Sequence, residues 1–243
     1  MDITKFAILK KLAGGGGGGG DHAAEDAIIS RTITDYTNDR VTSIGNYAFT
    51  GCSSLTSADF PAATSIGESA FSECSNLTSA DFPAVTSIEN FAFSECSNLT
   101  SADFPAATSI GEFAFDVCSN LTSANFPAAT SIGGAAFSEC SSLTSADFPA
   151  VTSIENFAFE VCSNLTSITL RVTTQVCTLS NTSAFNSTPI KSGTGYIYVP
   201  AALIDSYKTA TNWTTYANQF RALESYTVDG TTTGELDPTK VNA

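Results

Sequence analysis

The sequence predicts a solenoid of stacked coils with a parallel β-sheet along one face. Three observations predict it: a unit of 22 residues occurs six times between residues 41 and 170, its fixed positions are mostly apolar or small, and each copy contains a short alternating stretch typical of a strand. A unit of this length cannot bury its own apolar side chains, whereas stacked units share one continuous core. The content of 42% hydrophobic residues argues against wholesale disorder of the 243-residue chain.

The chain opens with an arm, residues 1–13, and a poly-glycine tether, residues 14–20. Asp2 near the start and Lys10 and Lys11 near the end of the arm suit the dipole of a helix, but the segment is too short to be stable alone. Three interpretations remain open: a disordered terminus, a docking helix on a flexible tether, and glycine-packed association of several chains. Under the second, residues 1–20 join the protein to a larger assembly or to copies of itself.

Residues 21–40 are expected to form an N-terminal cap. The stretch AIISRTITDYTNDR (27–40) is rich in β-branched residues and predicts one or two capping strands. Ile33 stands one period before Leu55, which indicates a degenerate first unit.

Residues 41–170 hold the six repeats. Within a unit, the stretch LTSADF predicts a strand with Leu55, Ala58 and Phe60 pointing inward, and Pro61 ends it because proline donates no ladder hydrogen bond. The opposite face is expected to consist of turns and short helices. The predicted strands cover residues 55–60, 77–82, 99–104, 121–126, 143–148 and 165–170.

Residues 171–226 are expected to close the other end. The stretches RVTTQVCTL and GYIYV predict strands, Pro200 suits the first turn of a helix through Tyr207, and a second helix is expected near Trp213–Leu223. Residues 227–243 are expected to be a loose tail.

The repeat L-T-S-A-D-F-P-A-x-T-S-I-G-x-x-A-F-x-x-C-S-N resembles the BspA-type leucine-rich repeat over residues 41–170. The stretch at 195–223, GYIYVPAALIDSYKTATNWTTYANQFRAL, is similar to a C-terminal cap found behind such repeats in proteins of gut Firmicutes and their prophages. The resemblance implies a leucine-rich repeat solenoid with terminal caps.

The net charge of −14 is placed unevenly along the chain. Between Val41 and Leu170 there is no Lys, Arg or His but thirteen Asp and Glu residues, so this array repels phosphate and anionic lipid. Nucleic acid is therefore an unfavourable partner. Membrane insertion is excluded by the absence of an apolar run of about 18 residues. No segment has the pattern of a signal peptide.

The cysteines predict neither a metal site nor a disulfide. Stacked thiols at a 22-residue spacing are typical of packing groups, and zinc would require paired ligands of the C-x-x-C kind, which the sequence lacks. Cys177 is expected to be a structural thiol as well. The column consists of Cys52, Cys74, Cys96, Cys118, Cys140 and Cys162.

A column of acidic and amide residues is expected on the outer face of the strands. Two interpretations stay open for it, a solvated polar face and weak cation binding. Because the neighbours of the column repeat with it, no pair of carboxylates stands out as a catalytic acid and base. Its members are Asp59, Asp81, Asp103, Asn125 and Asp147.

The informative positions are those at which the copies disagree. The seventh position of the unit holds Tyr, Ser, Phe, Phe, Ala and Phe in turn, which a packed core would not accept, so this column is expected to be partly exposed. Exposed aromatic residues mark contact surfaces, although these rings would also be explained by lying flat over the neighbouring coil. With the apolar residues four positions later, the ligand-binding candidates are Tyr47, Phe91, Phe113, Val117, Phe157 and Val161.

The repeat array offers no general base, no partnered nucleophile and no phosphate loop, so the sequence predicts a protein that is not an enzyme and needs no cofactor. The leading hypothesis is a recognition or attachment protein that binds a protein or glycan ligand on a cell surface, outside the cell and carried by a phage-like particle or surface assembly. The alternative is a structural spacer or decoration protein whose terminal segments make the contacts.

Overall fold

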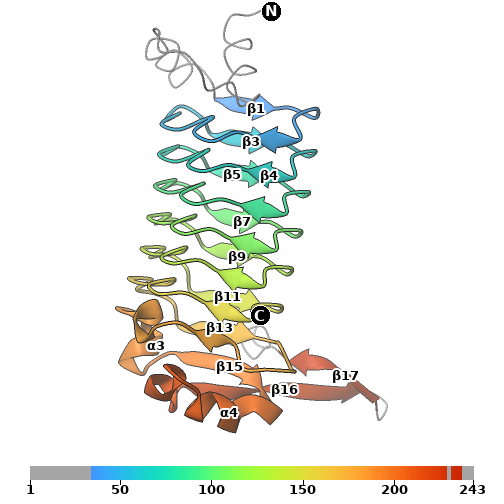
Figure 1. Cartoon of the computed structure of the whole chain (residues 1–243), viewed down its shortest axis with the longest axis vertical. Coiled ribbons are helices and arrows are strands. Elements are labelled where there is room, and N and C mark those ends of the chain that lie inside the picture. Colours follow the sequence, from blue (N-terminus) through green and yellow to red (C-terminus); the bar gives the residue numbers. More distant parts are fainter. Residues whose placement is uncertain (1–33, 229–230, 237–243) are drawn as a thin grey trace, which may run out of the picture.

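The computed structural model describes residues 34–228 and 231–236 (Figure 1). The arm, the tether and residues 21–33 of the expected cap lie outside the described residues, as does Ile33. The described chain forms a tall stack of coils whose axis runs from the N-terminal strand β1 (Asp35–Thr37) to helix α4 (Ile204–Thr209) in the C-terminal cap.

One parallel sheet contains the predicted strands, which are shorter than expected. Each covers three or four residues in place of six, because Leu55 and its counterparts precede the strand and Phe60 follows it in most coils. Each residue pairs with the residue 22 positions later, as in Ser57 with Ser79. The strands of the coils are β1 (Asp35–Thr37), β3 (Ser57–Asp59), β5 (Ser79–Asp81), β7 (Ser101–Asp103), β9 (Ser123–Asn125), β11 (Ser145–Phe148) and β13 (Ser167–Leu170).

The repeats contain a second parallel sheet that the sequence analysis did not predict. It lies where turns and short helices were expected, and its two-residue strands bury the isoleucine column while exposing the preceding serines wholly or in part. No helix occurs in described residues 34–170, where turns complete each coil. The strands are β2 (Ser43–Ile44), β4 (Ser65–Ile66), β6 (Ser87–Ile88), β8 (Ser109–Ile110), β10 (Ser131–Ile132), β12 (Ser153–Ile154) and β14 (Thr178–Leu179).

Two columns of phenylalanine rings fill the space between the sheets. The rings from Phe49 to Phe159 stack at centroid distances of 4.9–5.5 Å and within 4–5° of parallel. The rings from Phe60 to Phe126 stack at 5.5–5.8 Å. All of these residues are buried, so every coil supplies part of a core that no single coil could form.

The N-terminal end agrees with the expected degenerate unit. Strand β1 pairs with β3 at the 22-residue spacing, with Asp35 opposite Ser57. The ring of Tyr36 covers the first ring of each phenylalanine column, at 5.6 Å from Phe49 and 5.4 Å from Phe60.

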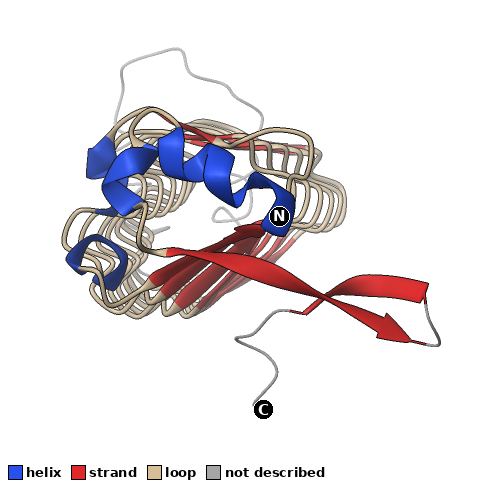
Figure 2. Cartoon of the chain, turned by 90° about the horizontal axis from the view of Figure 1, so that it is seen from below, coloured by secondary structure: helices blue, strands red, loops and turns tan. Residues whose placement is uncertain are grey.

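The C-terminal cap replaces the next coil and then closes the stack. The 3-10 helix η1 (Thr182–Phe185) places Phe185 on Phe159 at 5.6 Å, and Trp213 and Tyr216 cover Phe185 in turn. Figure 2, which looks along the stack, shows the cap helices lying across its end. The cap also contains α3 (Pro189–Ser192), β15 (Tyr196–Pro200), η2 (Ala201–Leu203), α4 (Ile204–Thr209), η3 (Trp213–Tyr216), β16 (Phe220–Val228) and β17 (Thr231–Leu236).

Two expectations for this end of the chain are wrong. The helix near Trp213–Leu223 is a single 3-10 turn, after which strand β16 begins at Phe220 and pairs with β15. The loose tail is in part a hairpin, because β16 continues to Val228 and pairs antiparallel with β17. The hairpin projects beyond the body of the solenoid (Figure 2).

Candidate functional site

The turns of the repeats carry two residues each in the left-handed backbone conformation. The seventh position of every unit has φ between 52 and 60°, and the eleventh has φ between 57 and 69°. The spacing of four between candidates such as Phe113 and Val117 therefore comes from two left-handed residues in one turn, not from a helical turn. Gly51 occupies the eleventh position in the first unit and adopts this conformation without steric cost.

The left-handed residues direct the backbone hydrogen bonds of the turn along the axis of the stack. In the coil that contains Phe113, Phe115 and Val117, these residues donate their N–H groups to the carbonyls of Gly134, Ala136 and Ser138 at 2.8–2.9 Å. The side chains at both left-handed positions are consequently free to point away from the core. The geometry explains why these positions vary in type while the phenylalanine between them does not.

Six side chains at these positions form what we call the turn ridge. Exposure is 49% for Tyr47, 37% for Phe91, 38% for Phe157 and 39% for Val161, whereas Phe113 and Val117 are half-buried. In the part of the chain with described side chains, four of the five exposed large hydrophobic residues belong to this ridge. The expected exposure holds for these six residues, but not for Ala135, which is buried and interrupts the ridge. The turn ridge consists of Tyr47, Phe91, Phe113, Val117, Phe157 and Val161.

Neighbouring coils hold the ridge rings in place. The rings of Phe91 and Phe113 stack at 4.8 Å and within 2° of parallel. The hydroxyl of Tyr47 donates to Glu68 Oε1 at 2.9 Å, and this hydrogen bond raises the pKa of Tyr47. The rings thus lie partly over their neighbours and remain exposed, so both interpretations of the column describe part of it.

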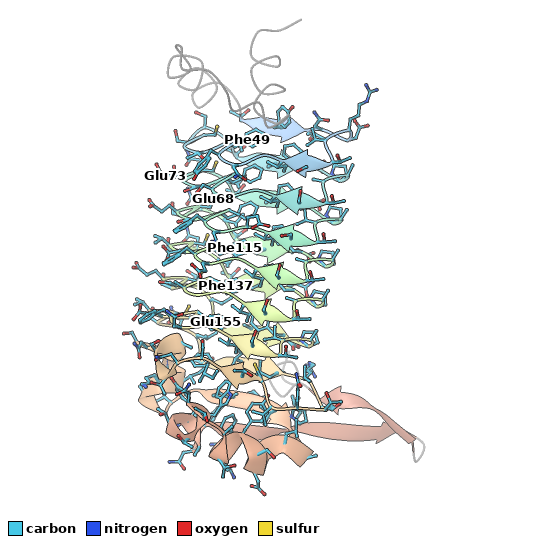
Figure 3. All side chains as sticks on the ribbon, in the orientation of Figure 1. Phe49, Glu68, Glu73, Phe115, Phe137 and Glu155 are labelled. Atoms are coloured by element: carbon cyan, nitrogen blue, oxygen red, sulfur yellow. The ribbon has the colours of Figure 1, made fainter. Side chains whose placement is uncertain are left out.

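Acidic groups surround the apolar part of the ridge. Glu73, Glu95 and Glu139 are exposed at the eleventh position of their units, and Glu73 lies at the outer margin of the stack while Phe115 lies within it (Figure 3). Burial raises the pKa of Asp116, and the nearby carboxylates of Glu139 and Glu95 raise it further. The ridge is therefore an apolar line in a negative field.

The polar column on the strands forms a second surface. In the first sheet, Asp59 pairs in register with Asp81, and Asp81 with Asp103. Asn125 interrupts the aspartates and donates its Nδ2 to Asp103 Oδ1 at 2.8 Å. The next member, Asp147, forms an ion pair with Arg171, whose Nη2 lies 2.8 Å from Oδ2.

A groove with a volume of about 520 Å³ lies over the second half of this surface. Arg171 and this groove are features that the sequence analysis did not identify. Two signals in the sequence were available: the single asparagine, Asn125, in an otherwise acidic column, and Arg171, the first basic residue after the array. The lining residues include Ser101, Asp103, Ser123, Asn125, Asp147 and Thr169.

The cysteine column lies in the core. All seven cysteines are buried and none forms a disulfide, and five of them donate Sγ–H to a phenylalanine carbonyl of the preceding coil at 3.0–3.2 Å. Burial raises the pKa of the thiols of Cys96, Cys118 and Cys140 well above the ordinary value, and that of Cys162 to about 12. Such thiols are poor nucleophiles and poor metal ligands.

The described residues hold no group of three or more His, Cys, Asp or Glu side chains placed to bind a metal ion. Within the same residues, no helix is long and apolar enough to cross a membrane.

The comparison with family models decides which repeat this is. The model of the BspA type leucine rich repeat region matches residues 30–128 and 86–201, with six copies. The chain belongs to the BspA-type leucine-rich repeat family. Its parallel strands, stacked coils and short strands are the architecture of a leucine-rich repeat scaffold, as the resemblance over residues 41–170 implied. A search of curated proteins finds no significant match.

Three solved leucine-rich repeat structures are similar to this chain, to different degrees. A leucine-rich repeat protein of T. pallidum is 26% identical with a TM-score of 0.56, over 60% of this chain and 70% of that one. A leucine-rich cell-surface protein of Faecalibacterium prausnitzii A2-165 is 24% identical with a TM-score of 0.46, over 74% and 55%. A Bacteroides ovatus ATCC 8483 leucine-rich repeat protein is 24% identical with a TM-score of 0.49, over 70% and 52%. This BspA-type chain thus matches about half of the length of the last two.

Proposed function

We propose that this BspA-type repeat protein is a non-enzymatic recognition protein that binds a protein partner through the turn ridge. The observation that carries the proposal is the collection of exposed large hydrophobic side chains in one line on the turns. Aromatic side chains are enriched among the residues that dominate binding at protein interfaces. Isolated exposed hydrophobic residues need no explanation, whereas several gathered on one set of turns do.

Strain at two ridge positions supports the same conclusion. Val117 and Val161 have φ of 58 and 57°, a conformation that is unfavourable for a β-branched residue. Glycine or glutamate occupies the equivalent turn position in the other four units. Valine therefore costs stability at these two positions, and an apolar contact with a partner gives a reason for its presence.

The charges around the ridge define the kind of partner. Glu73, Glu95 and Glu139 stand between or beside the apolar residues, and the whole array from 41 to 170 has no basic side chain. A partner surface with apolar and basic residues together would complement this pattern. We place such a partner on a cell surface, with the protein carried outside the cell by a phage-like particle or surface assembly. Support for this setting is the similarity of residues 195–223 to caps of prophage repeat proteins.

The test replaces the three phenylalanines of the ridge, Phe91, Phe113 and Phe157, with serine. Ser69 already occupies the same column with φ of 52°, so the turn accepts this residue. The full chain, immobilised on beads, is incubated with surface-protein extracts of intestinal bacteria. We expect the protein retained by the wild type to be lost with the triple variant, and its retention to weaken as salt is raised.

A matched control replaces Asp59 and Asp81 with serine, which removes charge from the strand face and leaves the ridge intact. This variant should retain the partner. Equal retention by the triple variant, with an unchanged circular dichroism spectrum, would contradict ridge binding and favour the alternative of a structural spacer or decoration protein whose ends make the contacts.

A further inference from the structure

We propose that the groove on the outer face of β7, β9, β11 and β13 is a second binding site, and that its ligand is a neutral oligosaccharide. The site is separate from the turn ridge, because it is built from the strands and not from the turns. It does not rest on the function proposed above.

The groove is lined by two columns of polar side chains that the sheet holds in register. One column contributes the hydroxyls of Ser101, Ser123 and Ser145, which have no hydrogen-bond partner among the described residues. The spacing between adjacent strands, about 4.8 Å, repeats these hydroxyls at intervals similar to those between polar groups along an oligosaccharide. The groove therefore presents a regular array of small donors and acceptors.

The hydroxyl of a largely buried residue also opens into the groove. Thr169 lines it, is only 3% exposed, and makes no side-chain hydrogen bond to any described residue. The hydroxyl is accessible from the groove, so a ligand hydroxyl at this position can form a hydrogen bond with it. The equivalent positions in the acidic coils hold aspartates, which are more exposed.

The groove is also the place where the acidic column loses its charge. Asn125 is neutral and binds Asp103, and the charge of Asp147 is balanced by the guanidinium of Arg171. Asp59 and Asp81, outside the groove, have no such partner among the described residues. A ligand in the groove thus meets amide, hydroxyl and paired carboxylate groups and not an array of unpaired charges.

This chemistry favours a sugar over the other ligand classes. Strands β7 to β13 each pair with a neighbour on both sides, so an extended peptide finds no free strand edge to join. The apolar lining is limited to Ala124, Ala146 and Pro149, too small to hold large side chains. An anionic ligand would be repelled by Asp103, and the described residues hold no cluster suited to a metal ion.

Aromatic rings continue the same face beyond the groove. Tyr198 is in register with Thr169, and Tyr196 with Ser167, while the alternating residue Ile197 points into the core. Arg221 lies 4.2 Å from the ring centre of Tyr196 and holds it in place. The apolar faces of pyranose rings pack on such aromatic side chains, so a ligand longer than the groove would reach this end.

The experiment applies the full chain to an array of immobilised neutral, sialylated, sulfated and uronate-containing oligosaccharides. We expect neutral oligosaccharides to be bound, and the best of them to be confirmed in solution by calorimetry. Binding only to the acidic glycans, or to none of the neutral ones, overturns the proposal.

Two substitutions test the position of the site. Ser123→Trp fills the groove, and Asn125→Asp restores the aspartate of the repeat with almost no change of size; each should weaken binding of that oligosaccharide about tenfold or more. Ser57→Trp places the same side chain in the same column outside the groove and should have no effect. Because Asn125→Asp leaves the volume of the core untouched, unchanged binding by this variant contradicts the proposal even if Ser123→Trp unfolds the protein.

The triple replacement of Phe91, Phe113 and Phe157 by serine separates the two sites. Oligosaccharide binding should survive it. Loss of oligosaccharide binding in this variant, with the fold intact, would place the sugar on the turn ridge and overturn the assignment to the groove.

Discussion

The cysteine column shows how a single side chain contributes to every coil. Each buried thiol, from Cys74 to Cys162, donates to the carbonyl of a phenylalanine one coil earlier. That carbonyl already accepts the backbone N–H of the cysteine in its own coil, as Phe49 does from Cys52 at 3.0 Å, and the thiol of the next coil adds a second donor. Cysteine is small enough for the turn, and its thiol links one coil to the carbonyl of the coil before it, which supports a packing role for the column.

Burial of the thiols predicts that alkaline pH destabilises the protein. The pKa of Cys162 and that of Cys177 are raised to about 12, and those of Cys96, Cys118 and Cys140 rise as well. A folded pKa above the unfolded value gives a stability that is complete below the unfolded value of 9.0 and is lost as the pH rises through the folded value. Each thiol contributes a slope of at most about 1.4 kcal/mol per pH unit.

We therefore expect the free energy of unfolding to fall steeply between about pH 9 and pH 11. Urea unfolding at a series of pH values measures it. Tyr207 and Tyr216, whose pKa values are raised to about 12 by burial, act in the same direction. A Cys140→Ala variant removes one thiol and should have a shallower slope than the wild type. A free energy that stays constant over this range, or a slope unchanged by Cys140→Ala, would contradict the explanation.

At the scale of the elements, the hairpin β16–β17 is the part of the described structure in which two strands pair antiparallel. The first residues of β16, from Phe220 to Leu223, pair with β15 and complete the cap. From Glu224 onward, β16 pairs only with β17. A two-stranded hairpin is marginal on its own in water, so the projecting part contributes little to the stability of the solenoid.

Truncation of residues 224–243 should accordingly leave the unfolding free energy within about 1 kcal/mol of the wild type. Truncation from Phe220 is the matched comparison, because it also removes the pairing with β15 and the ring that contacts Tyr207 and Trp213 at 5.2 and 5.7 Å. The free energy of unfolding of that variant should be lower than that of the wild type by about 3 kcal/mol or more. Equal losses in the two truncations, measured by urea unfolding, would show that the hairpin itself supports the stack.

At the scale of the whole molecule, the stack has two different ends and two different faces. Tyr36 covers the phenylalanine columns at the first end, and Trp213 and Tyr216 cover them at the other. The turn ridge and the strand groove occupy separate parts of the coil, so both remain accessible in one protein. The arrangement suits a scaffold that is attached at one end and presents its sides to partners.

The arm and tether are predicted to provide that attachment. Residues 1–20 lie outside the described residues, and the prediction rests on their sequence: helix boundary signals on a segment too short to fold alone, followed by seven glycines. Deletion of residues 1–20 should shift the unfolding temperature of the solenoid by less than about 2 °C and abolish assembly. Light scattering of the full chain and the truncated chain measures assembly. Oligomers of the same size in both would show that the arm is only a tail.

Much of the architecture was determined by the sequence alone. The 22-residue period gave the parallel stacking, the register and the identity of the buried columns, because identical units can share a core only when equivalent residues lie on top of one another. It also predicted the partial exposure of the turn candidates, since a core position does not alternate between phenylalanine and serine. The binding roles of these residues stay predictions. So do the two interpretations of the polar column, as a solvated face or as a weak cation site.

Only the tertiary structure decided the rest, because these features depend on contacts between residues far apart in the chain. The second sheet has strands of two residues, such as Ser65–Ile66, which are too short to show a period and exist only because neighbouring coils supply partners. The charge balance of the strand groove depends on Arg171, which reaches back 24 residues to Asp147. The hairpin replaced the expected helix and tail because β15 offers Phe220 and its neighbours a sheet edge, and an available edge outweighs the local preference of a short segment.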